Sequence, residues 1–360
     1  MRHIAIVGAG AIGTLIAAKL IRQGHRMTVV GREHHLPTLR ERGLRVDAPD
    51  GSWRVMPHAV VAGVTEALST QPVDLLIVTV KAYDTAAIAE SLAAVAHPPH
   101  VLTLQNGVGN EETLADAIGP ERVLAGALTT PVEVLATGHV RVARPSYRIG
   151  LAPVHSTPQA EALLHEVGQA LAAEGFRVQY VDDYRSLKWT KLLMNITANA
   201  QAALLGWPPA RVFAHPVAGA LEVRAWREAL AVMRTLDIRP ISFGGYPLPL
   251  VTPLVERLPL AIVRPLMGRF ASGGRGDKMP SIYLDLERGR GKTEVPWLNG
   301  AVARYGRQVR VPTPVNAALD KLVAAVIAGH LPWSETRDRP ERILAAVREE
   351  EAHHASAQED

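Results

Sequence analysis

A glycine-rich turn near the start of the chain is the first group of residues whose types and spacing suggest chemistry. The turn has the pattern G-x-G-x-x-G and comprises Gly8, Ala9, Gly10, Ala11, Ile12 and Gly13. It follows a strand-like run, His3–Val7, and opens a helix-like run, which is the context in which this pattern holds a dinucleotide. The first glycine permits a tight turn, the second lets the backbone approach a pyrophosphate, and the third lets the helix pack on the strand. The N-terminus of that helix supplies free N–H groups and a partial positive charge for phosphates.

A basic residue follows the second strand-like run, Met27–Val30. Arg32 stands where a site for NAD usually has an acidic residue that accepts hydrogen bonds from the ribose. A guanidinium instead favours a 2′-phosphate through charge-assisted hydrogen bonds. The sequence therefore predicts NADPH as the cofactor. The adjacent Glu33 weakens this interpretation slightly, and a solvated surface arginine is the alternative.

Two polar residues follow later strand-like runs. Lys81 comes after Val73–Val80, and Asn106 comes after Val101–Leu104. Ligands of open α/β sheets bind beyond the carboxyl ends of the strands. Lys81 is therefore placed to contact the cofactor or a substrate carboxylate, and Asn106 could orient the nicotinamide or the substrate. A solvated lysine and a turn asparagine are the alternative interpretations.

A third polar group lies in a helix-like run in the second half of the chain. Lys191, Asn195 and Asn199 are spaced i, i+4 and i+8, which puts them on one face of a helix. The residues between them are mostly apolar, so this face interrupts a helix that is otherwise suited to burial. Because buried polar groups need partners, the three either satisfy one another and nearby backbone or bind a polar ligand. The spacing leaves both interpretations open.

The composition is that of a globular protein and excludes several functions. The 360 residues are 48% hydrophobic and 21% charged, with a formal net charge of +4. Basic residues are interleaved with acidic ones, whereas nucleic-acid binding requires clustered charge. The lack of cysteine excludes disulfides and thiolate metal sites, and the His34-His35 and His353-His354 pairs lack companion ligands, so no metal is assigned. Without a signal-peptide pattern or a membrane-length apolar run, a cytoplasmic location with no membrane partner is expected.

The elements that must position these residues indicate an α/β domain followed by a helical one. Strand-like and helix-like runs alternate over the first half, which predicts a mainly parallel sheet covered on both faces. The β-rich segment 122–150 is expected at the far edge of this sheet. From Tyr184 the pattern is helical, except that the Pro- and Gly-rich stretch 239–279 predicts broken helices or a long loop. The expected parts are a dinucleotide-binding domain (1–183), a helical domain (184–335), and a C-terminal helix with a polar tail (336–360).

Together these motifs resemble those of the ketopantoate reductase family in type and order. They are GAGAIG, Arg32, VKAY, QNGVGNEE, the helix from KLLMN to Asn199, and the TEV…LNG segment. The resemblance covers about residue 3 to about residue 330. It implies a Rossmann domain followed by an all-α domain like that of 6-phosphogluconate dehydrogenase. It also implies reduction of 2-dehydropantoate (ketopantoate) to pantoate by NADPH, a step in pantothenate and coenzyme A biosynthesis.

The resemblance further implies roles for individual residues. The family's catalytic lysine falls on Lys191, and its active-site glutamate falls on Glu294. Positions that contact the substrate or the nicotinamide side of the cofactor fall on Asn195, Asn199, Ser281, Lys81 and Asn106. The placement of Ser281 requires anchoring on Asp285 and one extra residue between Asp285 and Glu294.

Two segments near the expected substrate pocket depart from the family pattern. Trp207-Pro208-Pro209 replaces a further asparagine that the family can place there, and the Pro- and Gly-rich run up to Met279 is longer than expected. Another branched 2-keto acid is therefore an alternative substrate.

Two rival functions share part of the pattern. A 3-hydroxy-acid dehydrogenase of the 6-phosphogluconate dehydrogenase type would have a Gly-rich lead-in to its lysine, which Leu187-Lys188-Trp189-Thr190 does not supply. A non-catalytic NADP sensor would tolerate loss of the polar face that includes Lys191. Beyond the small-molecule substrate, a homodimer through the helical domain is expected.

Overall fold

The chain forms two compact units in the computed structural model, which describes residues 1–144, 146–275 and 279–359. The first unit comprises Met1–Gln105 and Gly109–Lys188, and the second comprises Asn106–Val108 and Trp189–Asp360. The units therefore divide within helix α7 (Tyr184–Ile196), whereas the sequence pattern places the boundary just before this helix. A three-residue piece of the first half of the chain belongs to the second unit.

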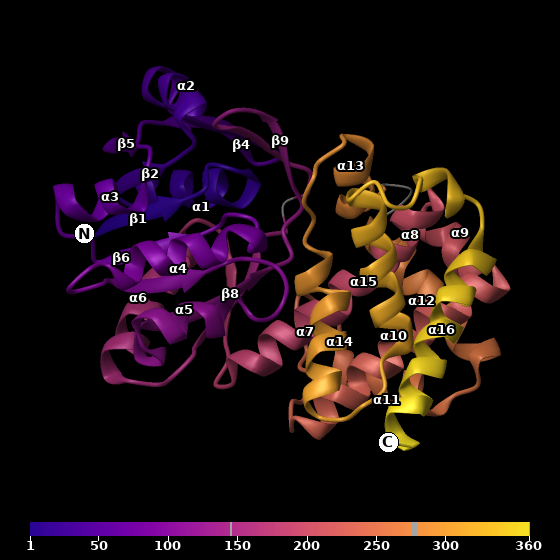
Figure 1. Ribbon diagram of the computed structural model, residues 1–360. Coiled ribbons are helices and arrows are strands. Elements are labelled where there is room, and N and C mark those ends of the chain that lie inside the picture. Colours follow the sequence, from indigo (N-terminus) through magenta and orange to yellow (C-terminus); the bar gives the residue numbers. More distant parts are fainter. Residues whose placement is uncertain (145, 276–278, 360) are drawn as a thin grey trace. The chain divides into compact units, whose positions relative to one another are not determined.

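The main sheet of the first unit has eight strands in the order β12-β11-β8-β7-β6-β1-β2-β5. Strands β5, β2, β1 and β6 of this order are labelled in Figure 1. The eight strands are β1 (His3–Val7), β2 (Arg26–Val30), β5 (Ala59–Val61), β6 (Leu75–Val78), β7 (His100–Thr103), β8 (Val123–Leu128), β11 (Arg148–Pro153) and β12 (Arg177–Tyr180). All neighbours pair in parallel except β8 and β11, which are antiparallel. The predicted mainly parallel sheet is confirmed.

Helices cover both faces of this sheet because successive strand residues point to opposite sides. Ile4 and Ile6 of β1 pack in one core with α1 and α6, whereas Ala5 and Val7 pack in another with α3, α4 and α5. These helices are α1 (Ala11–Arg22), α3 (Val64–Thr70), α4 (Thr85–Ala93), α5 (Asn110–Ile118) and α6 (Pro158–Ala173). Shorter connecting helices are η1 (Glu33–His35), α2 (Leu36–Arg42), η2 (Ala82–Asp84) and η3 (Pro120–Arg122).

A second sheet of four strands accompanies the first, in the order β4-β3-β10-β9. Its strands are β3 (Leu44–Ala48), β4 (Gly51–Val55), β9 (Val132–Ala136) and β10 (His139–Val142). The prediction that all of 122–150 forms the far edge of the main sheet is therefore wrong for β9 and β10. The edge of the main sheet next to β11 is formed by β12. The physical reason is burial: Val46, Val140 and Val142 share a core with α1, so this small sheet packs against that helix.

The regular secondary structure in the described residues of the second unit is helical, apart from one isolated β-bridge between Phe243 and Tyr246. After α7 come α8 (Ala200–Leu205), α9 (Pro209–Ala214), α10 (Pro216–Thr235), α11 (Leu248–Arg257), α12 (Leu260–Arg275), α13 (Ser281–Glu287), η4 (Val295–Trp297), α14 (Asn299–Gln308), α15 (Pro314–Ile327), η5 (Trp333–Glu335) and α16 (Pro340–Glu359). Trp226 of α10, Val302 of α14 and Val347 of α16 are fully buried in their common core. The predicted all-α second half is confirmed.

The Pro- and Gly-rich stretch 239–279 contains two helices, α11 and α12, each with an internal proline, Pro253 and Pro265. The broken helical region that the sequence predicts is therefore found, with residues 276–278 of the stretch outside the described residues. Both helices expose large apolar side chains, among them Leu250 and Ile262.

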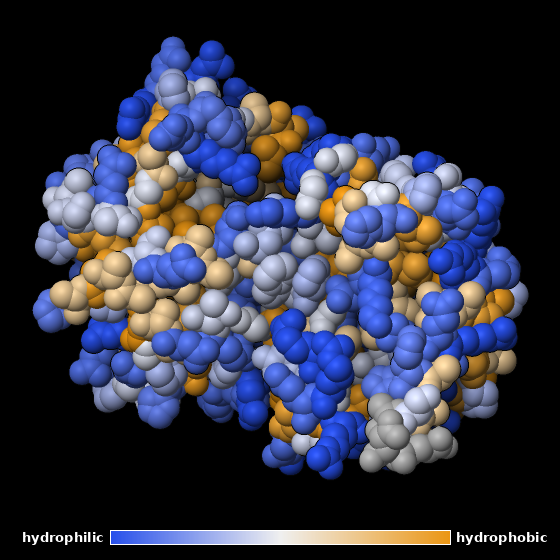
Figure 2. All heavy atoms as spheres, viewed as in Figure 1, coloured by the Kyte–Doolittle hydropathy of each residue, from blue (hydrophilic) through white to orange (hydrophobic). Residues whose placement is uncertain are grey.

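The surface drawn in Figure 2 is mostly hydrophilic, with apolar residues scattered among the charged ones. Within the described parts of the chain, no helix has both the length and the apolar character that crossing a membrane would require.

A half-buried carboxylate of α10, that of Glu228, caps the start of α15. Glu228 accepts hydrogen bonds from the backbone N–H groups of Val315 (2.9 Å) and Asn316 (3.0 Å), and from the Asn316 side chain (2.7 Å). Burial nevertheless raises the pKa of Glu228 to about 7, against these hydrogen bonds, which lower it. The folded state thus holds the proton of Glu228 more tightly than the unfolded chain does.

This raised pKa predicts a pH-dependent stability. Protonated Glu228 stabilises the folded state relative to the unfolded chain. This contribution to the free energy of unfolding is fully present below the ordinary glutamate pKa and is lost as the pH rises towards 7, by roughly 3 kcal/mol at most. We expect the free energy of unfolding of the native chain to fall between pH 5 and pH 7 relative to that of a Glu228→Gln variant. Denaturant unfolding at several pH values measures both, and parallel pH curves for the two proteins would show the prediction to be wrong.

Candidate active site

The glycine-rich turn lies between β1 and α1, as the sequence predicts. Gly8 has φ of +104°, a conformation that other residues rarely adopt. A Cβ at Gly13 would lie 1.8 Å from the Gly8 carbonyl oxygen, so only glycine lets α1 approach the strand this closely. A Cβ at Gly10 would meet no atom within 4 Å. The exposed Gly10 therefore leaves open space in front of the N-terminus of α1, where a pyrophosphate would be received.

The register of the sheet brings three strand ends to this turn. Val7 of β1 pairs with Val30 of β2 on one side and with Val78 of β6 on the other. Thr79, the residue after β6, donates a hydrogen bond from its hydroxyl to the Gly8 carbonyl at 2.8 Å. Arg32 follows β2 and Lys81 follows β6, so both leave the sheet at the same edge as Gly8.

The two cations at this edge differ in exposure. Arg32 is exposed and its guanidinium lies 4.0 Å from the Asp84 carboxylate, at the limit of an ion pair between solvated groups. Lys81 is half-buried and immediately precedes η2. The Arg32 side chain is therefore available to a solvent-facing phosphate.

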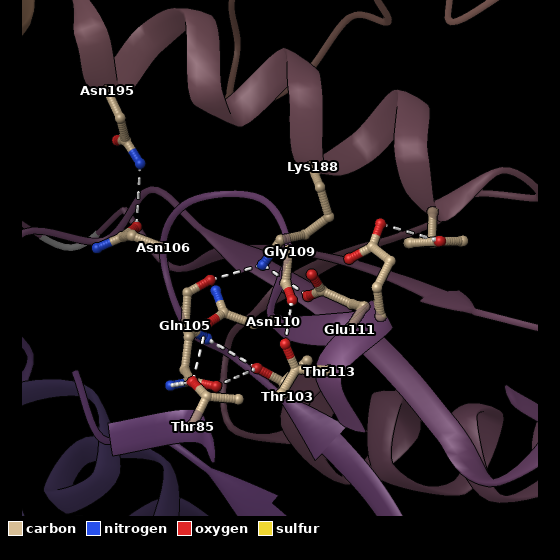
Figure 3. Close-up of polar contacts among 12 residues, drawn as sticks. Thr85, Thr103, Gln105, Asn106, Gly109, Asn110, Glu111, Thr113, Lys188 and Asn195 are labelled. Carbon is tan, nitrogen blue, oxygen red and sulfur yellow. Dashed lines mark hydrogen bonds and ion pairs between the residues drawn. The ribbon is translucent and has the colours of Figure 1, made fainter. Parts of the chain in front are cut away.

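In the second unit, α7 carries Lys191 and Asn195, both half-buried. The Asn195 side-chain amide donates a hydrogen bond of 3.2 Å to the side-chain oxygen of Asn106, which is exposed in the turn after β7 (Figure 3). Asn106 and Asn195 come from distant parts of the chain, and this contact brings two of the predicted site residues together.

The single helix expected through Asn199 is wrong, because α7 ends at Ile196. Ala198 has φ of +43°, and its N–H donates to the buried Glu222 carboxylate at 2.8 Å. Trp226 of α10 donates to the Thr197 hydroxyl at 3.0 Å. These α10 side chains stabilise a turn that ends the helix. Asn199 consequently precedes α8 instead of continuing the face of Asn195.

Asn199 is only 5% exposed, and its amide donates to the Asn195 carbonyl at 2.9 Å. Its side-chain oxygen is buried and accepts no hydrogen bond within the described residues. A buried acceptor of this kind requires a donor, and a hydroxyl group of a ligand is one that would satisfy it.

Glu294 is buried immediately before η4. The turn that carries Asn106 packs on η4: a Cβ at Gly107 would lie 2.6 Å from Trp297 atoms, and the Val108 N–H donates to the Trp297 carbonyl at 3.0 Å. The Trp297 N–H in turn donates to the Glu294 carbonyl at 2.9 Å. The backbone thus links Asn106 to Glu294 through Trp297.

Ser281 is the exposed first residue of α13. Asp285, which anchored its assignment, is buried in the same helix and pairs with Arg290 at 2.9 Å. Asp285 therefore has a structural partner, and the binding role of Ser281 stays a prediction.

Comparisons with known proteins bear on this arrangement of residues. The family model of ketopantoate reductase PanE/ApbA matches residues 4–154, and the model of the C-terminal part of the same family matches residues 183–327. The 2-dehydropantoate 2-reductase of Halobacterium salinarum is 30% identical over 323 residues, which are 89% of this chain and 97% of that relative. The chain belongs to the ketopantoate reductase family. It is accordingly an oxidoreductase of the kind that acts on CH–OH groups.

Solved structures agree with this family assignment. A ketopantoate reductase of the PanE/ApbA family from Ralstonia eutropha JMP134 superposes with a TM-score of 0.74 at 26% identity, covering 91% of this chain and 99% of the other. D-mandelate dehydrogenase in a ternary structure with NADH and anilino(oxo)acetate has the same fold, with a TM-score of 0.75 at 22% identity, covering 91% of this chain and 98% of that one. Membership of the family favours the reductase interpretation over the 3-hydroxy-acid dehydrogenase and the non-catalytic sensor.

Sequence reasoning missed a buried ion pair beside the family's motifs. Lys188 lies one turn before Lys191 on α7, and its ammonium is 2.8 Å from the Glu111 carboxylate and 2.6 Å from the Gln105 carbonyl oxygen (Figure 3). Both charged side chains are at most 2% exposed. Burial raises the pKa of Glu111, and the neighbouring Lys188 opposes that rise. The signal in the sequence is the acidic pair Glu111-Glu112 after the QNGVGN run, but the sequence does not indicate that Lys188 is the partner of Glu111.

Proposed function

We propose that the protein catalyses the NADPH-dependent reduction of 2-dehydropantoate to pantoate, in pantothenate and coenzyme A biosynthesis. The observation that carries the proposal is the hydrogen bond between Asn195 and Asn106. Asn195 is on the same helix as Lys191, and the turn that carries Asn106 packs on Trp297, whose N–H donates to the Glu294 carbonyl. In this way the second unit assembles amide groups beside an amine-bearing helix, which suits a small anionic keto acid.

The first unit fits a dinucleotide phosphate. The open space at Gly10, the unblocked N-terminus of α1 and the exposed Arg32 are the features that would hold the pyrophosphate and a 2′-phosphate. When bound, NADPH supplies a hydride to the keto carbon of the substrate. Lys81 would contact the cofactor beyond the end of β6, and Asn106 would orient the nicotinamide or the substrate.

Reduction of the keto group places negative charge on its oxygen. A cation beside that oxygen stabilises the charge and can donate a proton to it. Lys191 is proposed for this role, with the buried Glu294 holding the amine and tuning its pKa. Asn195, Asn199 and Ser281 would bind the carboxylate and hydroxyl groups without adding charge, and the unsatisfied Asn199 oxygen suits a hydroxyl donor.

The cofactor preference is testable at Arg32. We expect Arg32→Ala to weaken NADPH binding by roughly 1.5–3 kcal/mol, the range for a hydrogen bond to a charged group, while NADH binding changes little. Arg42 is the matched control, because its side chain is equally exposed (70%) and it pairs only loosely with Glu41 at 4.0 Å. Titration of each variant with both cofactors measures the effect. Equal affinity of the native protein for NADPH and NADH would contradict the prediction.

The substrate is tested by following NADPH oxidation with a panel of 2-keto acids. We expect 2-dehydropantoate to give the highest kcat/KM. The panel includes other branched aliphatic 2-keto acids and an aromatic one, since Trp207-Pro208-Pro209 replaces an expected asparagine and D-mandelate dehydrogenase shares the fold. A higher kcat/KM for any of these would transfer the proposal to that substrate. A homodimer through the helical unit and a cytoplasmic location stay predictions.

A further inference from the structure

A single buried ammonium group, that of Lys188, contacts two segments that flank the Asn106 turn. Its nitrogen lies 2.6 Å from the Gln105 carbonyl oxygen and 2.8 Å from a Glu111 carboxylate oxygen. Gln105 immediately precedes Asn106, and Glu111 is in the first turn of α5. All three groups belong to the first unit, so the contacts are internal to it.

The Gln105 side chain extends this arrangement to the neighbouring strand ends. Its amide donates to the Val80 carbonyl at 3.0 Å and to the Thr85 hydroxyl at 2.9 Å, and its oxygen accepts from the Thr103 hydroxyl at 3.0 Å. Figure 3 shows these buried groups gathered below Lys188. Lys188 thus binds the main-chain carbonyl of Gln105. The side chain of Gln105 is bound by Val80, Thr85 and Thr103.

The chain passes between the two units at three places, and the residues of this ion pair are close to them in the sequence. The crossings follow Gln105, Val108 and Lys188. Lys188 is the last residue before one crossing, and it binds the carbonyl of Gln105, the last residue before another. Its partner Glu111 is the third residue after Val108. The pair therefore connects the residue before the Asn106–Val108 turn to the first turn of α5, the helix that follows it.

A buried ion pair is weak evidence for stability, because the cost of removing both charges from water offsets their attraction. Replacing both partners by apolar residues of similar size is often neutral, whereas removing one leaves an unpaired buried charge. A carbonyl held by an ammonium at 2.6 Å is, however, fixed in direction. What the apolar replacement would lose is the orientation of the Gln105 peptide.

We propose that Lys188, paired with Glu111, is a positioning residue that sets the direction of the Asn106 side chain by holding the preceding carbonyl. Lys188 contacts neither substrate nor cofactor in this role. The effect on turnover rests on the proposed function of Asn106, whereas the effect on the turn does not.

The test compares the double variant Lys188→Met/Glu111→Leu with the native protein. We expect it to fold with a similar Tm, to keep its KM for the cofactor, and to lose up to about 10²-fold in kcat, the scale of a misplaced reacting group. Lys188→Met alone should be less stable than the double variant, because it leaves Glu111 unpaired. Lys19→Met is the matched control. Lys19 of α1 is equally buried and pairs with Glu174, the residue after α6, so its loss should lower Tm and leave kcat unchanged.

Hydrogen exchange gives a readout that needs no catalysis. The Val108 N–H, which donates to Trp297, should exchange faster in the folded double variant, while the strand amides of β6 keep their protection. Faster exchange with lower kcat supports the proposal. Faster exchange in a protein that reduces no 2-keto acid supports the positioning role and overturns the proposed function alone. Unchanged exchange together with unchanged kcat in the double variant overturns the positioning role.

Discussion

A Lys191→Ala variant should remain folded and lose about 10²–10⁴-fold in kcat, the usual range for general acid catalysis. Lys191 is half-buried on a helix whose neighbouring residues Leu192 and Leu193 are fully buried. Partial removal from water makes its charge costly unless a partner or a developing negative charge compensates it. The loss should therefore appear mainly in turnover, because the interaction strengthens as charge develops on the substrate oxygen.

The measurements are kcat and KM for the keto acid, with circular dichroism to establish the folded fraction. Lys321→Ala is the control, since Lys321 is 64% exposed on α15 and pairs with Glu350 at the surface. It should leave both kcat and stability nearly unchanged. A structural role for Lys191 predicts the opposite result, namely lower stability with normal turnover of the folded protein. Near-normal kcat in well-folded Lys191→Ala would remove the proposed proton donor.

The second large effect is expected at the glycine-rich turn, where two glycines should behave differently. Gly10→Ala adds a methyl group to open space, so the Tm should be unchanged. Cofactor binding should nevertheless weaken at least about tenfold, because one displaced hydrogen bond to a charged phosphate is worth ~1.5–3 kcal/mol. Gly13→Ala places its methyl group 1.8 Å from the Gly8 carbonyl oxygen and 2.5 Å from the Thr79 hydroxyl.

The Gly13→Ala protein must move α1 away from the strand. We expect it to lose cofactor binding and about 1–3 kcal/mol of stability, the usual cost of overpacking. Thermal unfolding and cofactor titration of the two variants separate the effects. Unchanged cofactor affinity in Gly10→Ala would show that no phosphate approaches this backbone, even if Gly13→Ala behaves as expected.

Much of the first unit could be predicted because its signals are local. The runs His3–Val7 and Val73–Val80 are apolar over most of their length. The turn at Gly8 has the glycine spacing G-x-G-x-x-G, which is typical of a dinucleotide-binding turn when it follows a strand and opens a helix. The small sheet was missed because β4 and β9 are largely exposed and lack a continuous apolar pattern. Its burial depends on contact with α1, which the sequence of each strand does not show.

The misjudged parts of the candidate site depend on distant residues. The spacing of Lys191, Asn195 and Asn199 fits an unbroken helix, and the turn at Ala198 exists because Glu222 and Trp226 arrive from α10. The pairing of Lys188 with Glu111 likewise joins residues that no local pattern connects. Residue types and order indicated the chemistry, whereas the hydrogen-bonding partners required the fold.

The three residues Asn106–Val108 also affect the order in which the two units can fold during translation. The ribosome synthesises these residues long before Trp297, the residue on which they pack. The ion pair of Lys188 with Glu111 can form once α7 begins to emerge, so the nascent first unit can be completed while its turn still lacks its partner. The helical unit, in contrast, cannot be made whole by expressing residues from Trp189 onwards, because that fragment lacks the segment that pairs with the Trp297 carbonyl.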